Sequence, residues 1–284
     1  MNISLFSTGH CKQLEALSIR GGRWGNISFP GIFAMIEHPE LGLILFDTGY
    51  SEQFYEATRR FPYRLYRWIT PVSIRHERSA AQHVKAAGFS PSEVRMVFIS
   101  HFHADHICGL NDFPNAEFIC SRAGYQSIKP LKGFAAVKRA FLPELIPSGF
   151  EARVRWIEDA QVVALHASFA PFKNGFDLLG DGKLIALELS GHALHQFGVI
   201  MQDESENHIL LGADACWSAR AVKENRLPHP LAFLVFDHAK QYKETFSRLV
   251  ELNRLNPELP MLFTHCEEAW RMCGSRLDPT EGDR

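Results

Sequence analysis

The chain has 284 residues, of which 46% are hydrophobic, and its 30 Lys and Arg against 32 Asp and Glu give a formal net charge of −2. This length can bury a large core without disulfides, and the near-neutral charge excludes nucleic acid as the main partner, which would require a basic surplus. The six cysteines form no CxxC pair, the N-terminal segment does not resemble a signal peptide, and no run reaches the ~18 apolar residues of a membrane span. We therefore expect a cytoplasmic protein with reduced thiols.

The first part of the chain alternates predicted strands with a predicted helix. The runs GIFAMIEH (31–38) and LGLILFDTG (41–49) predict the two strands of a hairpin, because apolar and β-branched residues dominate both. Residues 76–88 predict a helix that ends at Gly88, and RMVFIS (95–100) predicts a buried strand. Short β-branched and aromatic runs thus alternate with helical patterns along this part of the chain.

Residues around 125–180 have the least regular pattern. We expect a helical insertion there, interrupted by Pro130 and Pro143. No linker divides the chain, so a single domain over 1–284 is expected.

The second half is richer in predicted strands. Four runs of aliphatic and β-branched residues predict strands at 161–166, 183–190, 197–202 and 208–215, with GDG (180–182) as a turn between the first two. Residues 240–255 predict a helix with Asp237 as its N-cap, followed by the strand PMLFTH (260–265). One apolar stripe of that helix is expected to be buried: Tyr242, Phe246, Leu249 and Leu252.

The segment SHFHADH (100–106) places three histidines and one aspartate directly after the predicted strand 95–100. On an extended loop, His101 and His103 point to the same side and can converge on one cation, while Asp105 and His106 turn toward a neighbouring one. Imidazole and carboxylate are ligands that Zn²⁺ accepts, and the lack of a thiolate set favours an open catalytic site over a closed structural one. The segment therefore predicts a metal site on a loop at the end of a strand.

Three later residues supply further candidate ligands. His192 in LSGHALHQ, Asp214 in LLGADAC and His265 in MLFTHCEE each follow a predicted strand. One such residue alone is more often a turn residue or a hydrogen-bonded core residue than a ligand. Together with the first cluster, the three favour a site for two metal ions.

These residues resemble the dinuclear zinc hydrolases of the metallo-β-lactamase superfamily, through the HxHxDH pattern followed in order by a glycine-flanked His, an Asp after a strand and a final His. The resemblance implies an α+β fold, an αββα sandwich of two mixed β-sheets packed face to face, with helices on the outer faces and the metal site at one edge of the sheets. It also implies the roles of seven ligands: His101, His103 and His192 on the first zinc, Asp105, His106 and His265 on the second, and Asp214 bridging both. LILFDTG resembles the superfamily's early Asp-Thr-Gly turn, which would place Asp47 beneath the metal loop, supporting a ligand.

Within the superfamily, the chain most resembles the N-acyl homoserine lactonases. His192 and Asp214 are 22 residues apart, and the segment DACWSARAVKENRLP resembles the one that follows their bridging aspartate. Those lactonases carry a tyrosine three residues after that aspartate, where its hydroxyl assists the substrate carbonyl, whereas this chain has Trp217. An indole N–H donates one hydrogen bond but has no acid–base role. The implied substrate-binding position is therefore filled by a different side chain.

The expected reaction is metal-dependent hydrolysis of an ester bond. Two zinc ions lower the pKa of a bridging water, so that hydroxide attacks a carbonyl that one metal polarises. Histidine and aspartate also bind other divalent transition metals, which are therefore possible in place of zinc. We expect Asp105 to act both as a ligand and as a catalytic proton acceptor, with a purely ligating role as the alternative.

Residues 59–78 form a basic segment in which six arginines against one glutamate give a local charge of +5. Tyr63, Tyr66 and Trp68 lie between the charges, a mixture suited to an anionic partner, a substrate lid or a homodimer contact. A solvated face with arginines paired to acids elsewhere is the alternative. We take Arg64 and Arg67, with Trp217, as candidate substrate-binding residues.

Three functions remain open from the sequence. The first is a lactonase that acts on a small-molecule ester or lactone, such as an acyl homoserine lactone. The second is a thioesterase that acts on acyl-CoA or an acyl carrier protein, whose negative charges would meet the arginines. The third is a metal-containing binding or regulatory protein with little turnover.

Overall fold

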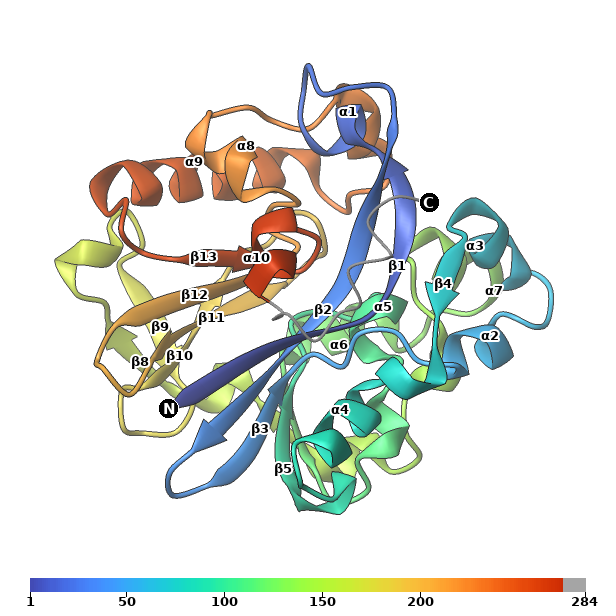
Figure 1. The fold of residues 1–284 in the computed structure, drawn as a ribbon, viewed down its shortest axis with the longest axis horizontal. Helices are drawn as coiled ribbons and strands as arrows, with labels where there is room; N and C mark the ends of the chain where they lie inside the picture. Colours follow the sequence, from blue (N-terminus) through green and yellow to red (C-terminus); the bar gives the residue numbers. More distant parts are fainter. Residues whose placement is uncertain (273–284) are drawn as a thin grey trace.

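A computed structural model of the chain describes residues 1–272, and in it two mixed β-sheets pack face to face between layers of helices (Figure 1). Within that range, the first sheet has seven strands. Their spatial order is β4 (Val72–Ile74), β1 (Asn2–Leu14), β2 (Asn26–His38), β3 (Gly42–Phe46), β5 (Val94–Phe98), β6 (Glu117–Cys120) and β7 (Val154–Trp156). Strands β4, β1, β2 and β3 pair antiparallel, whereas β3, β5, β6 and β7 pair parallel.

The second sheet has six strands in the described range. Their order is β13 (Met261–Phe263), β12 (His208–Ala213), β11 (Phe197–Gln202), β10 (Leu184–Glu188), β9 (Asn174–Asp177) and β8 (Gln161–Ala164). All neighbours pair antiparallel except β12 and β13, which are parallel. Strands β10, β12 and β13 therefore run in one direction and end at the same edge.

Helices cover the outer faces of the two sheets. Figure 1 shows α8 and α9 on the side of the second sheet, and α2, α3, α4 and α7 on the side of the first. Among the described helices, none combines the length and the apolar character needed to cross a membrane. The helices are α1 (Glu15–Ser18), α2 (Gln53–Ala57), α3 (Arg64–Ile69), α4 (Ala80–Ala86), α5 (Ala104–Ile107), α6 (Arg122–Ile128), α7 (Gly133–Lys138), α8 (Ala219–Lys223), α9 (Ala239–Leu255) and α10 (Glu267–Met272).

Strand β2 shows why the layers pack in this order. Ile32, Ala34 and Ile36 belong to the core that the first sheet shares with the second, whereas Phe33 and Met35 belong to the core beneath the helices. Because successive side chains of a strand point to opposite faces, this apolar run buries both of its faces. Burial is worth about 25 cal/mol per Å² of apolar surface, so the two cores are the main source of stability. The αββα sandwich predicted from the sequence is confirmed.

Several predicted elements are also confirmed. The hairpin is β2 and β3, the predicted strand 95–100 is β5, and the predicted helix at 240–255 is α9. The predicted stripe of α9 is buried against the second sheet: Tyr242, Phe246, Leu249 and Leu252. The five cysteines in the described range are free thiols, and Cys273 lies outside that range.

The segment around 125–180 differs from the expected pattern. Helices α6 and α7 occupy its first part and β8 is the strand predicted at 161–166, but β7 and β9, which were not predicted, extend the two sheets as well. The turn at 180–182 consequently joins β9 to β10, and the Asp177 side chain accepts hydrogen bonds there from the Gly180 and Gly182 N–H groups (2.9 and 3.0 Å). The strands β7 and β9, of three and four residues, depend on distant pairing partners, so they leave little local pattern in the sequence.

Candidate metal centre

Five strand ends of the two sheets position the candidate ligands and Asp47, which contacts one of them. Asp47 follows β3 and His101 follows β5, and these two strands are parallel and end together. His192, Asp214 and His265 follow β10, β12 and β13, which also share one direction. Asp47 and Ala213 adopt left-handed backbone angles, with φ of 59° and 47°, at the points where the chain leaves β3 and β12. Strain of this kind gathers at functional sites, where surrounding structure maintains it.

The structure brings together all seven residues that the resemblance implied as ligands, and all seven are buried. Their nitrogen and oxygen atoms form three groups in which every atom lies within 4.8 Å of the others. The groups are His101 with His103 and His192, His101 with His106 and Asp214, and Asp105 with His106 and His265.

Asp214 lies between the two sets of histidines. Its Oδ1 is 3.4 Å from His106 Nε2, and its Oδ2 is 3.2 Å from His192 Nε2 and 3.1 Å from His265 Nε2. Asp105 Oδ2 lies 3.3 Å from His265 Nε2 on one side of the cluster. A carboxylate in this central position can offer one oxygen to each of two neighbouring cations.

Three of the imidazoles contact oxygen atoms outside the cluster through Nδ1, and that of His101 lies 3.0 Å from the Ser100 hydroxyl oxygen. His106 Nδ1–H donates to Asp47 Oδ2 (2.7 Å), and His265 Nδ1–H donates to the carbonyl of Pro30 (2.8 Å), because these oxygens can only accept. Asp47 also accepts from the N–H and the hydroxyl of Ser100, each at 2.8 Å. With Nδ1 occupied, each ring directs Nε2 into the cluster, an arrangement that is common in metal sites.

The protonation tendencies of the cluster follow from burial and from its carboxylates. Burial lowers the pKa of His101, and it lowers the pKa of His192 to about 3. Burial also acts to lower the pKa of His106, but the Asp47, Asp105 and Asp214 carboxylates outweigh it and raise that pKa to about 10. The carboxylates thus favour a positive charge in this buried cluster. A protonated histidine can provide that charge, and so can a divalent cation.

Unpaired polar atoms show that the cluster fits a metal ion. His101 Nε2, His106 Nε2 and Asp214 Oδ1 are fully buried and make no hydrogen bond with any part of residues 1–272. Each unsatisfied buried group costs about 1–3 kcal/mol unless a ligand or a cation takes its lone pair. Imidazole and carboxylate form a donor set that borderline divalent transition metals accept. The residues present therefore fit a centre for divalent metal ions.

An aromatic wall, defined here as Phe29, Trp217 and Phe236, borders the cluster. The Trp217 ring lies edge-on to Phe29 and Phe236, with centroid distances of 5.8 and 5.0 Å. Its indole N–H donates to Asp214 Oδ2 (3.2 Å), so this predicted substrate residue contacts the central carboxylate. Phe29 stacks on His265 and Phe236 packs on His192. Neither phenylalanine had a recognisable signal in the sequence.

The turn that carries His192 is held by three contacts that the sequence did not reveal. Gly191 has φ 137°, and a Cβ there would lie 2.2 Å from the Tyr242 backbone nitrogen of α9, so only glycine fits. Asp237 pairs with Arg139 (2.5 Å) and accepts a hydrogen bond from Leu194 N–H (2.8 Å). The expected N-cap role of Asp237 is wrong.

His238 caps α9 instead, because its side chain accepts from Gln241 N–H (3.1 Å). Because His238 caps the helix, the Asp237 carboxylate is available to contact the turn that carries His192. The sequence around Asp237 indicates the helix that follows it but not the distant turn that it contacts.

The other predicted substrate residues lie on α3, which is exposed along one side. Arg64 donates two hydrogen bonds to the carbonyl of Arg59 (3.1 and 2.6 Å), and the Arg67 guanidinium lies 4.8 Å from the centre of the Tyr55 ring. Tyr66 on the same helix is buried, and the Asp105 carboxylate adds to burial in raising its pKa. Helix α3 therefore turns Tyr66 toward the cluster side and its arginines toward solvent.

Comparisons with known proteins agree with this architecture. Residues 34–258 match the metallo-beta-lactamase superfamily. The N-acyl homoserine lactonase AttM of Rhizobium johnstonii is 29% identical over 230 residues, which cover 79% of this chain and 79% of that protein.

Two solved structures share the fold at low sequence identity. One is an N-acyl homoserine lactone hydrolase with the product N-hexanoyl-L-homoserine bound at its catalytic metal centre; it has a TM-score of 0.67 and 17% identity, covering 96% of each chain. Another is AidC, a dizinc quorum-quenching lactonase in complex with a product, with a TM-score of 0.63, 16% identity and coverage of 93% of this chain and 87% of that chain. Because the superfamily match extends over most of the chain and the sandwich places the histidines and aspartates at its edge, this protein belongs to the metallo-beta-lactamase superfamily.

Proposed function

We propose that this protein is a single-domain hydrolase that uses two divalent metal ions, zinc being the first candidate, to open the ester ring of an acyl homoserine lactone or a similar lactone. The observation that carries the proposal is the position of Asp214, whose two oxygens face different histidines of one buried cluster. The AttM relative and the product-bound lactone hydrolase favour a lactone as the substrate.

The three groups of donor atoms suggest how the ligands divide. His101, His103 and His192 would hold one ion, Asp105, His106 and His265 the other, and Asp214 both. Two such ions, when bound, activate water for attack and polarise the carbonyl of the ester.

The chain's own residues would complete the site. The Asp105 carboxylate is ionised, because His106 and His265 overcome the effect of burial and hold its pKa at about 2. We assign Asp105 the transfer of a proton during ester cleavage, since a carboxylate beside the reacting bond can accept one. The aromatic wall offers an apolar face against which an acyl chain can pack, and it excludes water from one side of the cluster.

A substrate panel tests the proposal directly. Metal-loaded protein should hydrolyse N-hexanoyl homoserine lactone, as measured by the acid released, and treatment with a chelator should remove the activity. Hydrolysis of acyl thioesters without hydrolysis of lactones would favour the thioesterase. Bound metal with no turnover on lactones, thioesters and phosphodiesters would favour a binding or regulatory protein.

Replacement of Trp217 by tyrosine tests the lactone assignment. We expect Trp217→Tyr to preserve lactone turnover or to raise it by up to about tenfold, because a phenol hydroxyl can donate to the substrate carbonyl whereas the indole N–H is engaged by Asp214. Trp217→Phe is the control, since it keeps a ring without a donor and should give no gain. Equal loss of turnover in both variants would show that the indole itself shapes the pocket.

The thioesterase is the second candidate because exposed arginines stand on α3 and in the segment before it. Changing Arg60, Arg64 and Arg67 together to glutamine should lower kcat/KM for a carrier-bound thioester by roughly ten- to a hundredfold, and rising salt should mimic the change. A neutral lactone should be affected little, and Arg254→Gln on α9 serves as a surface control. Equal losses on every substrate would instead assign the segment a structural role.

A further inference from the structure

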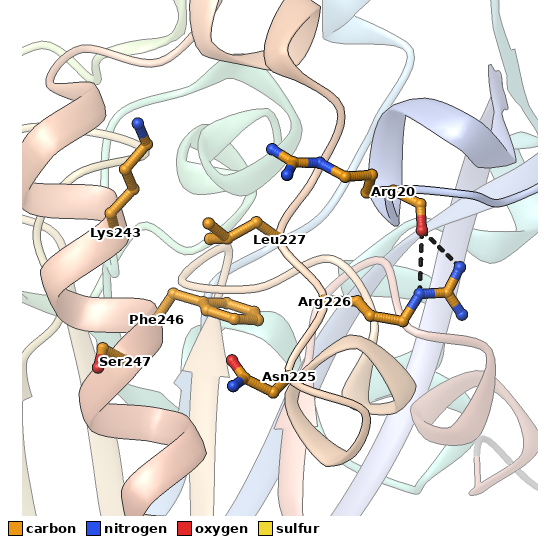
Figure 2. A pocket seen from close by; sticks show the side chains of 7 residues that line it. All are labelled: Arg20, Asn225, Arg226, Leu227, Lys243, Phe246 and Ser247. Carbon is orange, nitrogen blue, oxygen red and sulfur yellow. Dashed lines mark hydrogen bonds between the residues drawn. The ribbon is translucent and has the colours of Figure 1, made fainter.

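A cavity of about 410 Å³ lies between α9, the segment that follows α8 and the segment that follows α1 (Figure 2). None of the residues that line it belongs to the cluster of histidines and aspartates. Its volume falls within the roughly 300–1,000 Å³ of ordinary small-molecule sites. The cavity is therefore a separate candidate binding site.

The lining of this cavity is cationic at the mouth and apolar at the floor. The Arg20 guanidinium extends toward the side of the cavity on which Lys243 stands, and the charged ends of both side chains lie above Leu227 and Phe246 (Figure 2). Among the described residues that line the cavity, none is acidic. Two exposed cations above an apolar floor suit a molecule that carries both a negative charge and an apolar body.

The walls of the cavity are fixed by hydrogen bonds. Arg20 N–H donates to the carbonyl of Leu227 (2.8 Å), and Arg226 Nε–H donates to the carbonyl of Arg20 (2.9 Å). Arg226 also pairs with Glu224, so its charge is partly neutralised and its side chain turns away from the mouth. These contacts hold the two segments together before any ligand binds, which reduces the entropy cost of binding.

The floor is fixed as well. Phe246 is 2% exposed and stacks on Tyr242 of the same helix, and the Lys243 ammonium lies 5.0 Å from the centre of the Phe233 ring. An inorganic anion would gain nothing from the apolar floor, whereas an aliphatic or aromatic body would cover the partly exposed Leu227 side chain and the small part of Phe246 that faces the cavity. The apolar floor therefore favours an organic anion over a free inorganic one.

We propose that this cavity binds a small amphipathic carboxylate, with its carboxylate between Arg20 and Lys243 and its apolar part on Leu227 and Phe246. The planar guanidinium of Arg20 offers paired N–H donors to the two carboxylate oxygens, and the Lys243 ammonium adds a further donor. The site is distinct from the proposed hydrolytic centre and does not depend on its chemistry.

Calorimetric titration of the metal-loaded protein with octanoate tests the proposal. We expect saturable binding to one site. Octan-1-ol, which lacks the charge, and acetate and inorganic phosphate, which lack the apolar body, should each bind at least about tenfold more weakly. Acetate or phosphate binding as tightly as octanoate would overturn the role of the apolar floor.

Variants locate the binding in this cavity. The double change Arg20→Gln and Lys243→Gln should weaken octanoate binding by about ten- to a hundredfold, whereas Lys240→Gln, on the same helix but outside the cavity, should leave it unchanged. Ser247→Trp, at an exposed position of the lining, should block binding by filling the space while thermal unfolding stays the same. Unaltered octanoate binding in the double variant and in Ser247→Trp would place the ligand elsewhere and refute the proposal.

Discussion

Replacement of Asp214 by alanine is expected to lower the bound metal from about two equivalents toward one and to reduce hydrolysis by about a thousandfold or more. The carboxylate is 2% exposed and faces His106, His192 and His265 at 3.1–3.4 Å, so no other side chain can take its place between the two sets of ligands. A thousandfold loss corresponds to about 4 kcal/mol of transition-state stabilisation, the scale on which a metal ion acts. Elemental analysis and steady-state kinetics measure the two effects.

The fold of this variant should remain intact, because the two apolar cores and not the cluster hold the sheets together. Asp159→Ala is the matched control: it removes an exposed carboxylate that pairs with Arg122, and such surface pairs contribute little. A variant that retains two equivalents of metal and normal turnover would contradict the bridging position of Asp214.

Much of the cluster could be predicted because its residues follow recognisable strands. His101, His103, Asp105 and His106 lie within six positions directly after an apolar run, and a strand end is visible from hydropathy alone. Parallel strands finish at one edge of a sheet, so ligands that each follow a strand tend to meet there. The structure accordingly brings these residues together with those that follow β10, β12 and β13.

Contacts between distant segments could not be predicted in the same way. Arg139 and Asp237 are 98 positions apart, and nothing near either residue indicates the other. Phe29 and Phe236 are apolar residues among 22 phenylalanines in the chain, so their place beside His265 and His192 appears only after folding. Local patterns report the period of a strand or a helix, whereas these contacts depend on how the layers pack.

The second large effect is expected at Asp47, which contacts a proposed ligand without being one. Asp47→Asn should weaken metal binding by about ten- to a hundredfold, because the carboxylate that orients His106 through its Nδ1–H would be replaced by a neutral amide. Asparagine is the appropriate replacement, since it preserves the volume and tolerates the φ of 59° that Asp47 adopts at the end of β3. A competition assay with a chromophoric chelator measures the affinity.

A positioning role for Asp47 predicts more than a general loss of stability. Turnover of Asp47→Asn should recover in large part when metal is supplied in excess, because the proposed ligands themselves are unchanged. Since excess metal also refolds an unfolded fraction by mass action, the metal-free variant should in addition unfold at the same temperature as the metal-free unaltered protein. Ser100→Ala offers a graded comparison: it removes the hydroxyl that donates to Asp47 Oδ2 at 2.8 Å and lies 3.0 Å from His101 Nδ1. It leaves the contacts of Asp47 with the Ser100 N–H and with His106 in place, so its effect on metal affinity should be smaller. If Asp47→Asn binds metal as tightly as the unaltered protein, the positioning role of Asp47 is contradicted. The orientation of His106 would then be fixed by the packing around its imidazole ring, which is 0% exposed.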